Sequence, residues 1–456
     1  MQRRRLLELY TRHYNHTLGR LFDIAGCPVE ASARGTRIFD EEGESYLDCA
    51  AGYGTFGVGH LHPRVQDAAQ RQLARMAASP AGLYDEAVAM LLTRLRGLLP
   101  PSLSRVFLAG GGSEAVEIAL RTVMWALPER KRLVAAQNSY HGKTLGALSV
   151  MGQPHLRSMF EPLCAAVEFV PYGDAEAMAR AIGQGATAVF LESILGGGHL
   201  TVPPDGYLAA VRAACDRTGT PLAVDEVQTG FGRTGTMFAF EREGIVPDIV
   251  IMSKGVTGGH AGIGIAVMTE ALAEAAGDAY EAGPDAPHAG MWNSALTCAT
   301  ACAAIDVIVD EDLPARAASA GARLIATLND AVRDYPAFVH DVPGRGLMTG
   351  VRLRNNIIES AVWMQMLRRR VITGLSTNDH TAHPVLRFFP PLTIDDAEIA
   401  LAADALRDSL RELARVPSLL YDLANKVFRL QHYLPLPLLR AGARLLSPPP
   451  AARHTL

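Results

Sequence analysis

The sequence predicts an α/β protein: a large domain with a mostly parallel sheet, and a smaller α+β domain built from both chain ends. From about residue 64, short apolar strands alternate with helical patterns, and this alternation is typical of a parallel sheet covered on both faces. After residues 344–346, Gly-Arg-Gly, the pattern changes to shorter strands and two helices. A chain of 456 residues is also too long for one small core.

The elements follow in order. Residues 36–48 predict a hairpin around Glu42-Gly43, and a helix follows at 63–76. In the large domain we expect strands at 105–110, 132–137, 186–193, 221–226 and 248–254, with helices at 112–127 and 205–219. A long helix begins near residue 294 and leads out of this domain. The smaller domain should hold strands at 347–353, 371–375 and 385–389, and helices at 357–369 and 395–414.

These patterns predict four segments. Residues 1–63 are an N-terminal part of the small domain, 64–337 the large domain, 338–416 the small domain, and 417–456 an extension. The extension is apolar and basic, with Asp422 as its only acid, and we expect it to pack on the protein or a dimer mate. Contact with a membrane surface or a carrier or other partner protein is the alternative, although Pro435 and Pro437 interrupt a long helix.

Composition excludes several classes of protein. The chain is 49% hydrophobic and 20% charged, which is ordinary for a globular protein. A net charge of −4 gives no sign of nucleic-acid binding. Cys298 and Cys302 lie four residues apart without nearby histidines, so no metal site is expected, and sparse cysteines indicate reduced thiols and a cytoplasmic location. Polar residues interrupt the basic N-terminus before it reaches the length of a signal peptide.

A glycine loop and an aromatic motif stand at strand ends. Gly110 to Gly112 expose backbone N–H groups, and Ser113 adds a hydroxyl where a helix begins, which favours a phosphate. The motif Tyr140-His141-Gly142 follows the next strand and should lie at the same edge of the sheet, where doubly wound proteins bind ligands. An aromatic ring there can stack on a flat cofactor.

Asp225 and Lys254 end two apolar strands. One interpretation is a plain buried ion pair, because a buried charge needs a partner. The other is a lysine that forms a Schiff base with pyridoxal phosphate (PLP), with the acid holding the pyridine nitrogen protonated.

The motifs "YLDCAAGYGTFGVGHLHPRV", "GGSEAVEIAL", "YHGKTLGAL", "DEVQTGFGRTG", "PDIVIMSKG" and "VLRFFPPLTI" occur in one order over about residues 25–415. In this the chain resembles the class III, fold-type I PLP-dependent aminotransferases, and within them the putrescine and ornithine aminotransferase branch. The resemblance implies a seven-stranded-type sheet, PLP as cofactor, small-molecule amine and oxo-acid substrates, and a homodimer with active sites at its interface.

The resemblance also implies roles for individual residues. Lys254 would form the internal aldimine and move protons, Asp225 would pair with the ring nitrogen, and Glu192 would face the active site. Arg387 would receive a substrate carboxylate, with Tyr53 also in the substrate site. The remaining cofactor contacts would be Gly111, Gly112, Ser113 for the phosphate, Tyr140, His141, Gly142 at the ring, and Gln228 near the ring hydroxyl.

Three departures from the family pattern concern the pocket. Ser193, Leu195 and Gly197 replace a proline, a glutamine and the glutamate that masks the arginine in ornithine-type relatives, which leaves Arg387 uncovered or differently partnered. The segment "HAGMWNSAL", 288–296, lacks the threonine that a neighbouring subunit supplies to the phosphate, so Asn293, Ser294 or backbone would replace it. Glycines 110–111 replace an asparagine–serine pair. Together these favour an altered acceptor pocket in a specialised biosynthetic enzyme.

The predicted activity is a transamination (EC 2.6.1 type) by ping-pong chemistry, between a terminal or ω-amine and an oxo acid such as 2-oxoglutarate or pyruvate. The alternatives are another PLP reaction, as a decarboxylase, racemase or aminomutase, and a non-catalytic PLP-binding partner subunit.

Overall fold

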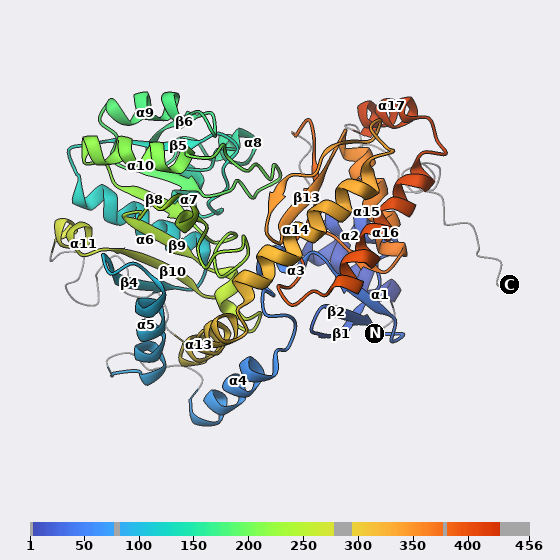
Figure 1. Ribbon diagram of the computed structural model, residues 1–456, viewed down its shortest axis with the longest axis horizontal. Coiled ribbons are helices and arrows are strands. Elements are labelled where there is room, and N and C mark those ends of the chain that lie inside the picture. The colour runs from blue at the N-terminus through green and yellow to red at the C-terminus, as the bar shows by residue number, and fades with distance from the viewer. Residues whose placement is uncertain (1–2, 77–82, 278–293, 377–380, 429–456) are drawn as a thin grey trace.

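The computed structural model describes residues 3–76, 83–277, 294–376 and 381–428, which form a large and a small lobe (Figure 1). The large lobe contains a seven-stranded sheet with strand order β4-β10-β9-β8-β7-β5-β6. Only β10 runs antiparallel to its neighbours in this described sheet, so the predicted mostly parallel sheet is confirmed. Its strands are β4 (Leu103–Ala109), β5 (Arg132–Ala136), β6 (Ala166–Val170), β7 (Val189–Glu192), β8 (Leu222–Asp225), β9 (Ile249–Met252) and β10 (Gly264–Thr269).

Helices cover both faces of this sheet, because its central strands are apolar on both sides. Ala223 and Ile251 pack in one cluster with the buried face of α6, whereas Val224 and Val250 pack in another with α10. The helical elements of this lobe are α6 (Gly112–Ala126), α7 (Leu145–Ser149), α8 (Pro154–Arg157), η2 (Ser158–Phe160), α9 (Ala175–Gly183), α10 (Tyr207–Thr218), η3 (Ala239–Glu243), η4 (Lys254–Thr257) and α11 (Glu270–Ala276).

Two long helices connect the lobes. The helix α13 (Ala295–Asp310) packs against α4 (Pro63–Arg75) and α5 (Glu86–Leu98) beside the large lobe. The next helix, α14 (Leu313–Val332), packs against α16 (Asp396–Leu413) of the small lobe. The long helix predicted from residue 294 is therefore two helices, and the break falls at Asp312, whose φ of 46° is in the left-handed region.

The small lobe combines both ends of the chain. Its first sheet has the order β1-β2-β3-β14, in which β14 pairs in parallel with β3, so the predicted hairpin is extended by a C-terminal strand. In the second sheet β13 pairs with β11, β12 and β15. The elements are β1 (Glu30–Arg34), β2 (Arg37–Asp40), β3 (Ser45–Asp48), β11 (Val339–Asp341), β12 (Gly344–Arg345), β13 (Met348–Leu353), β14 (Val371–Ile372), β15 (Val385–Phe388) and α15 (Asn356–Arg368).

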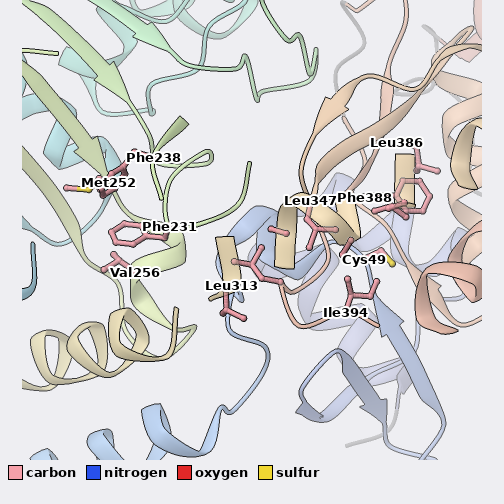
Figure 2. Close-up of a cluster of buried hydrophobic side chains, with 14 of the residues drawn as sticks. Cys49, Phe231, Phe238, Met252, Val256, Leu313, Leu347, Leu386, Phe388 and Ile394 are labelled. Carbon is pink, nitrogen blue, oxygen red and sulfur yellow. The ribbon is translucent and has the colours of Figure 1, made fainter. Parts of the chain in front are cut away.

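One hydrophobic core crosses from lobe to lobe. Figure 2 shows Phe231 and Met252 of the large lobe together with Leu347 and Phe388 of the small lobe, all in one buried cluster. Burial of this shared apolar surface opposes separation of the lobes. The ends of β7, β8 and β9 are therefore held facing the small lobe, although the domain boundaries at 63, 337 and 416 stay predictions.

The remaining helices lie at the chain ends: α1 (Arg3–Leu9), a π-helical turn η1 (Tyr10–Tyr14), α2 (His16–Ala25), the short α3 (Ala51–Gly54) and α17 (Ser418–Phe428). Tyr421 of α17 is fully buried against Phe338, and Asp422 lies 2.9 Å from Arg354. The first part of the C-terminal extension thus packs on the small lobe. Residues 429–456, with Pro435 and Pro437, lie outside the described residues. None of the described helices is both long and apolar enough to cross a membrane.

Candidate active site

Two acidic side chains meet at the carboxyl edge of the large sheet. Glu192 ends β7 and Asp225 ends β8, and the two residues pair directly in the register of these parallel strands. Asp225 is also opposite Ile251 of β9, and Lys254 follows three residues later at the start of η4. Ligands of doubly wound sheets bind at this edge. The two poles predicted from sequence therefore lie at the ends of adjacent strands, although Lys254 follows the end of β9 instead of belonging to it as predicted.

Asp225 is held by two donors. The Val227 N–H donates to its Oδ1 at 3.0 Å, and His141 Nδ1 lies 2.9 Å from its Oδ2. Burial disfavours a charged His141, but the hydrogen bond and negative charge of Asp225 outweigh it, so the pKa of His141 is raised. His141 therefore donates from Nδ1 to Asp225 at the floor of the site.

Glu192 ties together two loops that border the site. Its Oε1 accepts a hydrogen bond from the Tyr140 N–H at 2.8 Å, and its Oε2 accepts one from the Gly196 N–H at 2.9 Å. Burial is the main cause that raises the pKa of Glu192 to about 7. This carboxyl group thus fixes the position of the Tyr140 loop.

Lys254 is partly buried and has an unusual backbone. Its φ of 42° lies in the left-handed region, which is costly for a residue with a side chain and is found at functional sites. Burial lowers the pKa of Lys254 to about 8, while the charge of Asp225 raises it and that of Arg387 lowers it. A substantial fraction of neutral amine is therefore present near neutral pH, as a nucleophile or base requires.

The glycine loop, residues 110–112, lies against the turn that follows Asp225. Gly111 precedes the first helical residue of α6, Gly112, whose Cβ position would lie 3.2 Å from a methyl group of Val227. A Cβ on Gly142, where φ is 122°, would lie 2.2 Å from Ser113 Oγ. These two glycines allow the α6 N-terminus, the His141 loop and the Asp225 turn to converge. The Gly110 N–H is already used, because it donates to Glu114 at 2.7 Å.

Three buried polar atoms in this region have no hydrogen-bond partner among the described residues: His141 Nε2, Gln228 Oε1 and Arg387 Nε. Unpaired buried polar atoms are rare in proteins unless a ligand satisfies them. Gln228 Oε1 lies so close to Gly196 that a Cβ there would be 1.7 Å away. An anion at the α6 N-terminus, a protonated ring nitrogen at Asp225 and a hydroxyl near Gln228 are the groups of PLP that this arrangement fits, with Tyr140 half-buried beside it.

Arg387 and Tyr53 form a second unit of the site. The Arg387 guanidinium carbon lies 4.5 Å from the centre of the Tyr53 ring, and the Tyr53 φ of 56° is left-handed. Arg387 Nη2 donates to the Leu375 carbonyl at 2.5 Å, and the Tyr53 hydroxyl donates to the same oxygen at 3.3 Å. Of the two expectations for Arg387, uncovered or differently partnered, the second describes its neighbours: a backbone carbonyl is its hydrogen-bond acceptor.

Two predicted phosphate contacts are less defined. Asn293 lies outside the described residues, as do residues 288–292 of the "HAGMWNSAL" segment. Ser294 is the N-cap of α13, and its Oγ accepts a hydrogen bond from the Thr297 N–H at 3.4 Å.

Sequence reasoning missed two features here. It placed His141 beside the ring but gave no hydrogen bond to Asp225, and it did not identify Leu375, whose backbone carbonyl holds Arg387. The only sequence signal for the histidine was its place in the Tyr-His-Gly motif at a strand end, and a backbone carbonyl leaves no signal at all.

A lysine with a lowered pKa, an aspartate at the end of the adjacent strand and a glycine loop opening a helix define a fold-type I PLP-dependent enzyme. The chain belongs to the class-III aminotransferase family, whose sequence profile matches residues 26–410. It is therefore an aminotransferase, and its cofactor is pyridoxal 5′-phosphate.

Individual relatives agree with this family. A putrescine aminotransferase from Pectobacterium atrosepticum is 36% identical over 394 residues, 84% of this chain and 83% of the relative. An (S)-enantioselective ω-transaminase from Thermomicrobium roseum superposes with a TM-score of 0.80 at 28% identity, covering 90% of this chain and 99% of the other. The ornithine aminotransferase of Toxoplasma gondii, solved with PLP at partial occupancy in its active site, gives 0.78 at 27% identity, covering 89% and 96%.

Proposed function

We propose that this aminotransferase moves the amino group of a terminal (ω) amine to an oxo acid such as 2-oxoglutarate or pyruvate, in two half-reactions at one site. The observation that carries the proposal is the Arg387–Tyr53 unit: a buried guanidinium whose Nε–H has no partner among the described residues. Such a group favours a carboxylate, which accepts hydrogen bonds from arginine in its plane. An oxo acid brings this carboxylate, and the names of the putrescine and ω-transaminase relatives support a terminal amine as donor.

Bound PLP would supply an electrophilic carbon and an electron-withdrawing ring. Lys254 would hold that carbon and, once released by the amine substrate, take the proton from the substrate carbon next to nitrogen. Its lowered pKa supports this role, because the base must be neutral to act. Asp225, hydrogen-bonded to His141, would pair with the ring nitrogen and keep it protonated.

The other contacts would position the cofactor. The N–H groups of Gly111 and Gly112 and the Ser113 hydroxyl would hold the phosphate, with Ser294 and Asn293 as further candidates. Gln228 Oε1 would accept a hydrogen bond from the ring hydroxyl, and Tyr140 would stack on the ring, with Gly142 giving the space for this approach. Glu192 would keep the Tyr140 loop in place.

We further infer a homodimer with active sites at its interface and a cytoplasmic location, as the family resemblance and the sparse cysteines favour. The altered residues Ser193, Leu195 and Gly197 support a specialised acceptor pocket. Sedimentation of the holoenzyme measures the dimer, and a monomer with full activity would argue against it.

The test is a panel of amine donors, including putrescine, ornithine and ω-amino acids, each with 2-oxoglutarate and with pyruvate. An amine donor alone should bleach the visible band of bound PLP, and an oxo acid should restore it. Lys254→Ala should abolish both the band and turnover. Activity that survives this substitution would refute the assignment of Lys254.

Two other outcomes of the panel matter. Release of carbon dioxide or racemised product without amino transfer would favour another PLP reaction, and failure to retain PLP would favour a non-catalytic subunit. Fast turnover of putrescine or ornithine with 2-oxoglutarate would argue against a specialised acceptor pocket.

A further inference from the structure

The carbonyl that holds Arg387 is itself held by a buried acid from another helix. Leu375 O accepts hydrogen bonds from both Arg387 Nη2 and the Tyr53 hydroxyl. The next residue, Ser376, donates from its N–H and from its Oγ to Glu359 Oε1, each at 2.6 Å. A single carboxylate oxygen therefore fixes the peptide that carries the arginine's acceptor.

Glu359 is an unusual place for a charge. It lies on α15, is 2% exposed, and belongs to a helix whose other residues from Ile357 to Leu367 are almost all buried. Burying a carboxylate is costly unless strong hydrogen bonds compensate, and the two short bonds to Ser376 provide them. An apolar residue would avoid this cost, so the acid is expected to serve a purpose beyond filling space.

We propose that Glu359 is a positioning residue for recognition of the substrate carboxylate. Through Ser376 it sets the Leu375 carbonyl, and through that carbonyl it sets both Arg387 and Tyr53. This inference rests on the proposed role of Arg387 in the transamination.

The geometry holds Arg387 in place without a direct ion pair to Glu359. Arg387 is held by a neutral carbonyl, so its hydrogen-bonding edge keeps the unpartnered Nε–H for a ligand. Burial lowers the pKa of Arg387, while Tyr53 and the negative charge of Glu359 oppose that decrease. Glu359 thus stabilises the buried Arg387 cation without contacting its Nε–H, so a substrate carboxylate need not displace Glu359.

The experiment uses holoenzyme and measures the oxo-acid and amine half-reactions separately. Glu359→Gln keeps the size of the side chain and one acceptor oxygen but replaces charge-assisted hydrogen bonds by neutral ones. We expect the KM for 2-oxoglutarate to rise about tenfold with little change in kcat, because charge-assisted hydrogen bonds are about twice as strong as neutral ones and the difference corresponds to about this factor in an equilibrium constant. Ser376→Ala, which loses only the hydroxyl, should raise the same KM about threefold.

The half-reaction with a donor that lacks a carboxylate, such as putrescine, should be unchanged in both variants. Glu412→Gln is the matched control: it neutralises another buried glutamate of the small lobe, on α16, which pairs with Arg415 instead. It should leave both half-reactions at wild-type values.

Arg387→Gln separates the two levels of the proposal. If it raises the KM for 2-oxoglutarate and Glu359→Gln does not, the positioning role is refuted while the role of Arg387 stands. If neither variant changes this KM, both the positioning role of Glu359 and the carboxylate-binding role of Arg387 are refuted. If Glu359→Gln slows both half-reactions equally, Glu359 supports only the fold and the proposal is overturned.

Discussion

The titration of Lys254 should respond in opposite directions to two charges in the site. Asp225 raises the pKa of Lys254 and Arg387 lowers it, against a background in which burial has lowered it to about 8. Asp225→Asn removes a negative charge and should therefore move the midpoint to lower pH. Arg387→Gln removes a positive charge and should move it to higher pH.

The register of the sheet sets the size of the first shift. Asp225 is paired with Ile251 on the adjacent strand, and Lys254 lies three residues further along. With strands about 4.8 Å apart and a rise of about 3.3 Å per residue, the backbones of the two residues are on the order of 10 Å apart, and this value serves as an order-of-magnitude separation of their charges. At an effective dielectric constant of about 20, this separation corresponds to about 1.7 kcal/mol, or about one pH unit. The Arg387 shift should be smaller, since its charge affects Lys254 less than that of Asp225.

The assay is the rate at which apoprotein takes up PLP between pH 6 and 9.5, followed by the visible absorbance of the product. Only the neutral amine of Lys254 reacts, so the rate should rise with pH through its pKa. Wild type, Asp225→Asn and Arg387→Gln react with the same free cofactor, so the titration of the cofactor itself cancels when their midpoints are compared. Midpoints that move in the same direction, or not at all, would refute the view that Lys254 senses these two charges.

Three further predictions concern the site and its support. The pKa of Glu192 is raised to about 7 by burial, so its contribution to stability is complete below about pH 4.5 and is lost as the pH rises toward 7. The free energy of unfolding of Glu192→Gln apoprotein should therefore increase by about 1–3 kcal/mol relative to that of wild type as the pH rises from 5 to 8. A difference in thermal denaturation that does not change with pH would contradict this. Gly142→Ala, with its Cβ 2.2 Å from the phosphate-loop serine, should weaken PLP binding at least about tenfold in an equilibrium titration, whereas Gly183→Ala at the end of α9, with no atom within 4 Å of its Cβ, should not. Tyr421→Ala should destabilise the protein by about 3 kcal/mol in denaturant unfolding, while the exposed Leu419 should tolerate alanine; equal effects would show that α17 does not belong to the core.

The sequence alone determined five of the seven strands of the large sheet and the chemical poles of its site, whereas β6 and β10 were not among the predicted strands. Apolar runs that alternate with helical patterns permit little except a parallel sheet, and residues at the carboxyl ends of such strands must share one edge. Asp225 and Lys254 could therefore be predicted as neighbours, since strand ends are local properties of the chain. The glycine loop was predictable for the same reason, because a strand, glycines and a helix start lie within a few residues of one another.

Only the tertiary structure decided how these poles are supported. His141 reaches Asp225 across 84 positions in sequence, and Arg387 reaches a carbonyl of residue 375 that has no side-chain signature. Glu359 is in the sequence an ordinary polar residue of a predicted helix, and only the packing of α15 shows it to be buried against Ser376. Side-chain periodicity specifies which face of an element is buried, but not which distant backbone atom comes to lie against it, and those long-range contacts hold the substrate side of this site.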